Sequence, residues 1–436
     1  MQDGEAVVWK ERATTNRVQA RYWIETAYPL AEAAAIMAGE QSTGTFIRVP
    51  GETDELRERY AARVEEIVEL GVVNAPSLNG SGLVKKHTGP LVRRTAEVTL
   101  SWPLENMGPS LPNLLATVAG NLFELKPFSG LKLLDVTLPP EFLSRYQGPQ
   151  FGVDGTRRLT GVYNRPLIGT IIKPSVGMTP DQTAAQVRVL AEAGVDFIKD
   201  DELQSDGPHC PFEARLAAVM RVLDDHADVA GKRVMYAVNI TGEIDQMLRR
   251  HDAVAAAGGT CVMVSLNSIG LPALVELRRH TQVAIHGHRN GWGMLSRSHA
   301  TGMSFIAYQK FWRLAGIDHV HVNGLRNKFC EEDASVIASA RECLTPMFAA
   351  PAKGCEIMPV FSSGQSAQQA PDTYKALGSM DLMYACGGGI LAHPGGPAAG
   401  VRSLRQAWEA AASGVSLVAY AKEHEELRAA LEAFPA

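Results

Sequence analysis

The sequence predicts an α/β protein in which a smaller N-terminal α+β domain, of the ferredoxin-like kind, precedes a C-terminal (β/α)8 TIM barrel. Two observations predict the barrel: short apolar strands alternate with amphipathic helices over about 270 residues, and eight such strands fit in that length. A third observation, the Gly- and Pro-rich segment YQGPQFGVD at 146–154, marks a linker. We therefore expect an N-terminal domain at 1–147 and a catalytic barrel at 148–436.

The N-terminal third has the mixed pattern of an α+β domain. A helix is expected near Pro29–Ala38, because proline suits a first helical turn, and a second over TDELRERYAARVEEIVELG at 53–71. The segments RRTAEVTLSW (93–102) and LKLLDVTLP (131–139) alternate apolar and polar residues, which is typical of half-buried strands.

The barrel strands are expected at eight short apolar runs. In chain order they are IGTIIK (168–173), VDFIK (195–199), VMYAV (234–238), CVMVS (261–265), VAIH (283–286), HVHV (319–322), MPVF (358–361) and DLMYA (381–385). The helix after the first run is the clearest, with Thr179 as N-cap, Pro180 in the first turn and Gly194 at its end. A doubly wound open sheet is the alternative, but no GxGxxG follows the first strand, and eight units match a closed barrel.

Composition and charge disfavour several classes of function. The net charge of −5 favours neither nucleic acid nor an anionic membrane as a partner, although a small anionic substrate remains compatible with it. No run approaches the roughly 18 apolar residues of a membrane span, and MQDGEAVVWKER contains no signal core. The six cysteines have no metal-binding spacing. We expect a cytoplasmic protein with reduced thiols.

Polar residues collect where the predicted strands end, which is where TIM barrels carry their catalytic groups. The first strand ends at Lys173, and the second runs into Lys199, Asp200, Asp201 and Glu202. The later ends contribute His286, His288 and Arg289 from the fifth, His319, His321 and Lys328 from the sixth, Ser362, Ser363 and Gly364 from the seventh, and Gly387, Gly388 and Gly389 from the eighth. Six of the eight ends bear such residues, so the sequence predicts one active site at the barrel mouth.

The second strand end has the composition of a magnesium site. Asp201 and Glu202 offer the carboxylate oxygens that Mg2+ prefers, but two carboxylates alone make a weak site. Lys199 beside them would ordinarily be a counter-ion, and a solvated turn is the alternative interpretation. The place of this segment at a barrel strand end favours the metal site.

Anion binding is predicted at two further places. Gly387 and Gly388 would let backbone N–H groups approach a phosphate after the seventh and eighth strands, where TIM barrels often hold one, with a tight turn as the alternative. Arg289 could bind a second anionic group. His288 and His321 could bind substrate hydroxyls or move protons.

Eight segments resemble, in the same order, active-site motifs of the ribulose-bisphosphate carboxylase (RuBisCO) large chain. They are GEQSTGTF (39–46), AGNLFELK (119–126), GTIIKPSVG (169–177), DFIKDDE (196–202), IHGHR (285–289), DHVHVNGLRNK (318–328), PVFSSG (359–364) and CGGGILAHPGG (386–396). The resemblance covers nearly the whole chain, and it implies that Lys199 reacts with CO2 to form a carbamate. The carbamate would be a third oxygen ligand of Mg2+, beside Asp201 and Glu202.

The resemblance also implies roles for the other strand ends. Lys173 would be the acid/base lysine, and Lys328 the lid lysine that steadies the carboxylate derived from CO2. The implied substrate-binding residues are His288, His321, Arg289 as a phosphate clamp, Ser362, Ser363 and Gly364, with Thr45, Gly387 and Gly388 at the other phosphate. Glu40 and Asn121 would come from a neighbouring subunit, which implies a homodimer with shared active sites, either alone or within a higher oligomer.

Three departures from the family pattern bear on the reaction. Ser175 replaces the second lysine of a KPK motif, Phe46 replaces a tryptophan, and Ser363 replaces the first glycine of an SGG motif. They put carboxylation of ribulose bisphosphate in doubt and indicate the RuBisCO-like (type IV) branch, which uses this site for other enolate chemistry.

The retained lid lysine helps to choose a reaction, because a carboxylase or a decarboxylase must hold a carboxylate. The leading hypothesis is a carboxy-lyase that forms an enediolate and decarboxylates a phosphorylated β-keto sugar acid, as 3-oxo-isoapionate 4-phosphate decarboxylases of this branch do. The alternatives are an enolase or isomerase of a phosphorylated ketose, of the methylthio-sugar type used in methionine salvage, a true carboxylase, and a non-catalytic binding protein.

Overall fold

The computed structural model describes residues 16–44, 49–80 and 92–434. The described residues form two compact units, one made of those up to Arg145 together with Ser298–Ala307 and the other of Tyr146–Arg297 together with those from Tyr308 onward. A single boundary near residue 147 therefore describes the division incompletely, because a short segment from the second half of the chain belongs to the first unit. That segment supplies a strand to the N-terminal sheet, which no local pattern reveals.

The N-terminal unit is a five-stranded sheet with the order β10-β4-β1-β3-β2. Its elements are β1 (Arg17–Thr26), α1 (Leu30–Glu40), α2 (Asp54–Tyr60), β2 (Arg63–Val73), β3 (Arg93–Pro103), η1 (Leu104–Asn106), α3 (Leu111–Val118), η2 (Gly120–Glu124), β4 (Phe128–Thr137), η3 (Pro140–Ser144) and β10 (Thr301–Met303). The first four strands pair antiparallel, and β10 adds in parallel to β4. The β-α-β-β-α-β order with this sheet order confirms the predicted ferredoxin-like domain.

The helix predicted over 53–71 is wrong in its second half. Thr53 caps a helix that ends at Tyr60, and the chain then forms β2. The β-branched Ile67 pairs with Val98 of β3 in an antiparallel ladder. Pairing with a neighbouring strand outweighs the helical spacing of the glutamates and leucines, because strand preference is set by the partner as much as by the segment. Strand β1, whose alternate side chains are buried, was not predicted.

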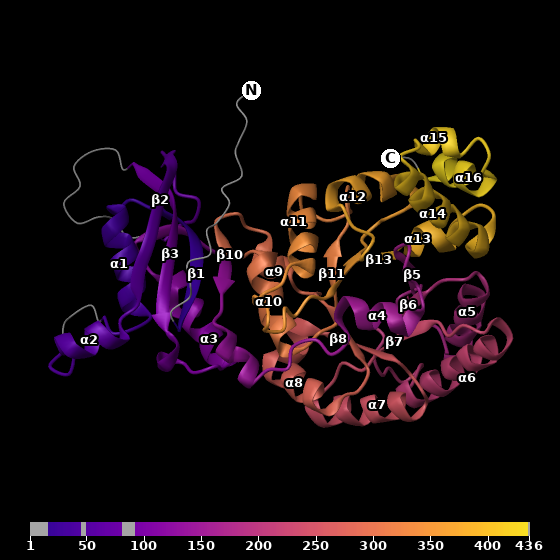
Figure 1. The fold of residues 1–436 in the computed structure, drawn as a ribbon, viewed down its shortest axis with the longest axis horizontal. Helices are drawn as coiled ribbons and strands as arrows, with labels where there is room; N and C mark the ends of the chain where they lie inside the picture. The colour runs from indigo at the N-terminus through magenta and orange to yellow at the C-terminus, as the bar shows by residue number, and fades with distance from the viewer. Residues whose placement is uncertain (1–15, 45–48, 81–91, 435–436) are drawn as a thin grey trace. The chain divides into compact units, whose positions relative to one another are not determined.

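The second unit is a closed barrel of eight parallel strands in the order β5-β6-β7-β8-β9-β11-β12-β13, which confirms the predicted fold class. The strands are β5 (Leu167–Ile171), β6 (Phe197–Lys199), β7 (Met235–Asn239), β8 (Cys261–Ser265), β9 (Ala284–His288), β11 (His319–Asn323), β12 (Met358–Phe361) and β13 (Met383–Ala385). All eight predicted runs contain or overlap these strands. The helices α5 to α8 lie along the outside of β5 to β8 (Figure 1).

The helices of this part of the chain follow the expected alternation. They are α4 (Gly152–Thr160), α5 (Pro180–Glu192), α6 (Phe212–Ala230), α7 (Ile244–Ala256), α8 (Leu266–His280), α9 (Gly293–Ser296), α10 (Phe305–Ala315), α11 (Asp333–Leu344), η4 (Ala367–Gln369), α12 (Ala370–Leu377), α13 (Gly387–Leu391), α14 (Gly396–Ser413), α15 (Leu417–Tyr420) and α16 (Glu425–Ala433). The cap predicted at Thr179 is present as a capping box with Gln182, and Pro180 opens α5.

The N-terminal end of the barrel is closed by α4 and the residues beside it. Phe151, Val153 and Leu159 pack against the apolar side chains inside the barrel. The backbone N–H groups of Phe151 and Gly152 donate to Asp318, which directly precedes β11. This packing leaves the opposite rim, formed by the carboxyl ends of the strands, as the side on which loops can build a site.

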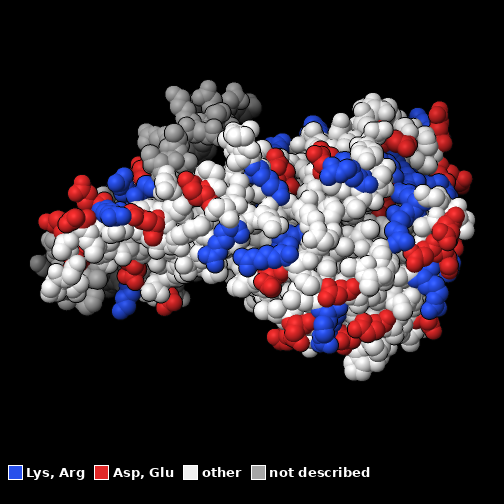
Figure 2. Space-filling view, turned by 60° about the horizontal axis from the view of Figure 1, so that its bottom comes forward, with Lys and Arg blue, Asp and Glu red and all other residues white. Residues whose placement is uncertain are grey.

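The surface and the helices agree with the bulk composition. Acidic and basic side chains are interspersed on the face drawn in Figure 2, and neither sign forms an extended field there. Among the described residues, every helix is too short or too polar to cross a lipid bilayer.

Candidate active site

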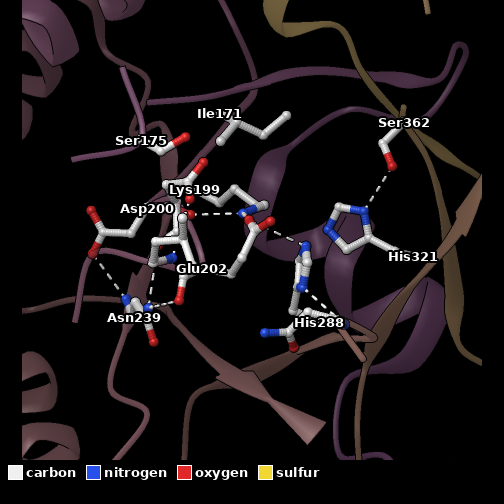
Figure 3. Close-up of polar contacts among 12 residues, drawn as sticks. Ile171, Ser175, Lys199, Asp200, Glu202, Asn239, His288, His321 and Ser362 are labelled. Atoms are coloured by element: carbon white, nitrogen blue, oxygen red, sulfur yellow. Dashed lines mark hydrogen bonds and ion pairs between the residues drawn. The ribbon is translucent and has the colours of Figure 1, made fainter. Parts of the chain in front are cut away.

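The carboxyl end of β6 brings three of the predicted site residues together. Lys199 is the last residue of the strand and is only 1 % exposed. Its Nζ donates to the backbone oxygen of Asp200 at 2.7 Å and lies 3.4 Å from Oε2 of Glu202 (Figure 3). The neighbouring carboxylate of Asp201 is also buried. A buried amine therefore lies beside two carboxylates, as the sequence predicted.

A second lysine enters this cluster from the end of β5. Nζ of Lys173 lies 2.6 Å from Oδ2 of Asp201 and donates to Oγ of Ser175 at 2.9 Å. The backbone N–H and C=O of Lys173 bond to the side chain of Gln186 on α5, which fixes this turn. The Lys173 side chain is 47 % exposed, so its amine is within reach of a substrate at the rim.

Asp200 anchors the turn that follows Lys199 to the neighbouring strand β7 and to helix α6. Its carboxylate accepts from the Tyr236 hydroxyl, from the Asn239 backbone N–H at 2.9 Å and from Arg215 at 3.3 Å. Nδ2 of Asn239 in turn donates to the backbone oxygens of Asp201 and Glu202, at 3.2 Å each. Because Asp200 and Arg215 are both fully buried, these bonds give the predicted metal-binding segment a rigid support.

Burial and neighbouring charges shift the pKa values of three groups at this point. Burial lowers the pKa of Lys199, although the surrounding carboxylates oppose the shift. Burial alone would raise the pKa of Glu202, but His288 and Lys199 together lower it to about 2. Burial, and then the charge of Lys199, lowers the pKa of His288 to about 4. The neutral form of an amine is the nucleophile towards CO2, so the lowered pKa of Lys199 is the shift that favours carbamate formation.

His288 has a defined tautomer. Its Nδ1 accepts from the Asn290 backbone N–H at 3.2 Å, so the ring proton of the neutral form lies on Nε2. Nε2 lies 3.4 Å from Oε2 of Glu202. His288 is thus a hydrogen-bond donor beside the carboxylate, and its role in contacting the substrate or moving protons stays a prediction.

The residues at the end of β6 fit a magnesium ion. They supply two carboxylates and a buried amine, which on reaction with CO2 would give a third anionic oxygen. Lys199, Asp201 and Glu202 would hold the ion. The side-chain amide of Asn239, which donates to the backbone oxygens of Asp201 and Glu202, would keep these two residues in place. His251, Asp252 and His280 form another group of potential ligands on the outer helices, where two of the three side chains are exposed.

On the other side of the mouth, His321 is held by two hydrogen bonds. Its Nδ1 lies 2.9 Å from Oγ of Ser362, as drawn in Figure 3, and its Nε2 lies 2.9 Å from Nε2 of His286. Burial lowers the pKa of His321 well below its ordinary value. Both ring nitrogens are thus engaged within the protein, which favours a role in orienting Ser362.

The predicted phosphate clamp Arg289 is engaged as well. Its Nη2 lies 2.5 Å from Oε2 of Glu331, on the loop that follows the predicted lid lysine, Lys328. The same carboxylate oxygen accepts from Nδ2 of Asn323 at 2.7 Å. Lys328 is exposed, its backbone N–H donates to the Ser363 oxygen at 3.1 Å, and its amine lies over the Phe329 ring.

The glycines after β13 lie where a TIM barrel commonly binds phosphate. Gly387 and Gly388 begin α13, a short extra helix after the eighth barrel strand. A Cβ added at either glycine would meet no heavy atom within 4 Å, so the space beside this backbone is open. Gly364, after β12, has a φ of +95°, which a side chain would strain.

The residues expected from a neighbouring subunit lie in the N-terminal unit. Nδ2 of Asn121 lies 3.4 Å from Oε1 of Glu40, so the two side chains form one polar group. Thr45 lies outside the described residues. Their roles stay predictions.

Sequence reasoning missed three residues that shape the site. Asn239 ends β7, one of the two strand ends that the sequence analysis left out, and its polar side chain at a strand end was an available signal. Asn323 ends β11 in the same way. Glu331 carried no signal of its own, because it lies in a loop of acidic residues that reads as a solvated surface.

Comparisons with known proteins show the family of the chain. The family model of the RuBisCO large chain catalytic domain matches residues 152–434, and that of its N-terminal domain matches 13–142. The chain is 55 % identical, over 96 % of its length and 99 % of the relative, to a 3-oxo-isoapionate-4-phosphate transcarboxylase/hydrolase of Xanthobacter autotrophicus. It is 46 % identical, over 95 % of its length and 97 % of the relative, to a 3-oxo-isoapionate-4-phosphate decarboxylase of Rhizobium etli.

A solved structure has the same fold throughout. A RuBisCO-like protein from Burkholderia fungorum superimposes with a TM-score of 0.89 at 47 % identity, covering 96 % of this chain and 99 % of that one. The match therefore extends over both domains of the chain. The chain belongs to the RuBisCO large-chain family, as one of its RuBisCO-like proteins.

Proposed function

We propose that this chain cleaves the bond between the carboxylate and the adjacent carbon of a phosphorylated β-keto sugar acid, with 3-oxo-isoapionate 4-phosphate as the substrate. The observation that carries the proposal is the cluster at the ends of β5 and β6, where Lys199 lies beside Glu202 and Lys173 lies against Asp201. The proteins at 46 % and 55 % identity that bear this substrate in their names support the choice of substrate.

The chain's own residues would perform the following steps. Lys199 as its carbamate, Asp201 and Glu202 would hold Mg2+, which when bound would stabilise negative charge on adjacent substrate oxygens. The carbon–carbon bond to the carboxylate breaks, its electron pair stays on the substrate as an enolate, and CO2 departs. Lys173, 2.6 Å from Asp201 and half exposed, would then deliver a proton to the carbon.

Two other groups would orient the substrate. Lys328, on the loop after β11, would hold the carboxylate before it departs. The open backbone at Gly387 and Gly388 would bind the phosphate, with the N-terminal N–H groups of α13 facing it. These roles require no residue that the chain has lost relative to the family pattern.

A second candidate outcome is transfer of the carboxyl group followed by hydrolysis. The relative with the higher identity, at 55 %, is a transcarboxylase/hydrolase and not a simple decarboxylase. Both outcomes begin with cleavage of the same bond, so they require the same ligands and the same acid. They differ in where the carboxyl carbon ends.

The deciding experiment follows that carbon. Substrate labelled with 13C in the carboxylate is incubated with the protein, Mg2+ and bicarbonate, and the products are followed by 13C NMR. Release of labelled CO2 supports decarboxylation, and label retained in a new carboxylic acid supports transfer with hydrolysis. Intact label with solvent deuterium entering beside the carbonyl supports the isomerase alternative. If the protein binds Mg2+ but neither moves the label nor exchanges deuterium into the substrate, the proposal is wrong.

We further propose that the active enzyme is a homodimer with shared active sites. Glu40 and Asn121 form a polar pair within the N-terminal unit, and the family resemblance assigns such residues to the neighbouring subunit's site. A C2 dimer is the commonest assembly of a single chain type.

A further inference from the structure

A carboxylate of this chain neutralises the arginine at the barrel rim. Glu331 and Arg289 approach to 2.5 Å, and their side chains are only 15 % and 7 % exposed. Screening by water and salt is weak at such burial, so the pair is strongly coupled. Arginine keeps its charge at any physiological pH, so Arg289 cannot leave the pair by losing a proton.

The Glu331 carboxylate is held by several neighbours and is not a mobile surface charge. Its Oε2 accepts from Nδ2 of Asn323 at 2.7 Å, and its Oε1 accepts from Oγ of Ser335 at 3.0 Å. Nδ2 of Asn327 donates to the Glu331 backbone oxygen at 3.0 Å. The side chain and the backbone of Glu331 are therefore both fixed, and its carboxylate has a defined position at the rim.

The bond from Asn323 extends to the end of the next strand. Oγ of Ser363 donates to Oδ1 of Asn323 at 2.8 Å, so the Asn323 amide connects Ser363 to Glu331. Both Asn323 and Ser363 have left-handed backbone conformations, with φ of 66° and 70°. Residues other than glycine adopt such conformations at a cost, and they persist where the surroundings enforce them. The hydroxyl of Ser363 thus adds a polar group at the rim where a glycine would leave open space.

We propose that Glu331 is a specificity-determining residue that makes the Arg289 side of the mouth a subsite for the uncharged, hydroxylated end of a sugar. The site would then accept a single phosphate, at Gly387 and Gly388, and reject sugar bisphosphates. A second phosphate carries a charge of about −2 and would face the Glu331 carboxylate, which repels it and already occupies Arg289. This inference rests on the proposed function, because it specifies the substrate class of the same site.

The test measures binding and needs no turnover. Isothermal titration in Mg2+ and bicarbonate compares ribulose 5-phosphate with ribulose 1,5-bisphosphate, for wild type and for Glu331→Gln. The amide keeps one oxygen to accept from Asn323 but removes the negative charge. We expect wild type to bind the bisphosphate no more tightly than the monophosphate. In Glu331→Gln the ratio of the two affinities should shift by at least about tenfold towards the bisphosphate.

Two controls make the result specific. Glu332→Gln removes the adjacent, exposed carboxylate and should bind as wild type does. The double variant Arg289→Met/Glu331→Gln should lose the gain, because the freed guanidinium is its cause. An unshifted ratio in folded Glu331→Gln would overturn the proposal. So would a wild-type preference of tenfold or more for the bisphosphate, which decides the question even if Glu331→Gln fails to fold. Absence of CO2 release would contradict the proposed reaction only. The binding comparison could still be interpreted, because it needs no turnover.

Discussion

The two sides of the barrel mouth pair cations with carboxylates in different ways. At β5 and β6 the cations are lysines, and burial lowers the pKa of Lys199 beside Glu202. At β9 and β11 the cation is Arg289, paired with Glu331. A lysine can lose its proton and react, whereas an arginine keeps its charge. The first side is therefore suited to chemistry, and the second to selection of a substrate.

The largest expected effect is on the lysine side. Lys199→Met keeps a long apolar stem but removes the amine that would carry the carbamate. We expect the rate of CO2 release to fall at least about 10³-fold, since a carbamate-bound ion stabilises the developing charge. The second readout is the carbamate itself, seen by 13C NMR of protein equilibrated with 13CO2.

The matched control is Lys422→Met, which removes an exposed lysine outside the site. It should keep both the activity and any carbamate signal. An unchanged carbamate signal in Lys199→Met, with the fold intact by circular dichroism, would contradict the assignment of this lysine. The β5 and β6 side of the mouth could then no longer be called the reactive side.

The second prediction asks whether the reactive side is completed by another subunit. Glu40→Gln and Lys199→Met should each be inactive alone. In randomly assembled dimers with shared sites, half of the dimers are mixed and each has one intact site, so about a quarter of the activity should return. Co-expression with two different affinity tags isolates the mixed dimers. Mixed dimers that stay inactive would show that each chain forms its site alone.

The contrast between the two sides also explains what the sequence could reveal. Lys199, Asp201 and Glu202 lie within four positions of one another, so their meeting follows from a strand that ends in a tight turn. Arg289 and Glu331 are 42 residues apart and meet through two loops. Loop conformations are set by many weak contacts, and no local pattern encodes them.

The same reasoning applies to the fold. The barrel strands were predictable because each is a short buried run between helices with clear caps, as at Thr179. The helix expected over 53–71 failed in its second half because β2 is defined by its pairing with β3. Strand β10 joins the N-terminal sheet from residue 301 onward, which only the tertiary structure determines.

The third prediction concerns the support beneath the reactive side. Asp200→Asn would leave Arg215 buried with its charge unpaired, since both residues are fully buried. Loss of one partner of such a pair costs about 3–5 kcal/mol of unfolding free energy. Urea denaturation measures this loss. Asp245→Asn, in an exposed pair with Arg249 on α7, is the control and should change stability little.

An unchanged unfolding midpoint in Asp200→Asn would mean that the turn at Lys199 does not depend on this pair. The rigid support argued for the reactive side would then have to come from Asn239 alone, through its bonds to the backbone of Asp201 and Glu202.

The smallest effect is expected from the histidines inside the barrel, below the selective side. Burial lowers the pKa of His319 to about 3, and its Nε2 lies 2.8 Å from Oγ1 of Thr156. In the unfolded chain this histidine takes up a proton below a pH of about 6.5, while in the folded protein it stays neutral down to about 3. The unfolded state therefore binds more protons in this window, so stability is full above it and falls as the pH drops through it.

In His319→Asn the unfolded chain should take up one proton fewer in this pH window. The fall in unfolding free energy should become shallower by about 1.4 kcal/mol per pH unit in the range from roughly pH 5.5 to 4. Urea unfolding across this range measures the slope, and the slopes of the two proteins should coincide near pH 8, where the unfolded histidine is neutral as well. Equal slopes at acid pH would mean that His319 takes up its proton in the folded barrel. In that case the histidines below His321 could exchange protons with the mouth, and the selective side would no longer be chemically inert.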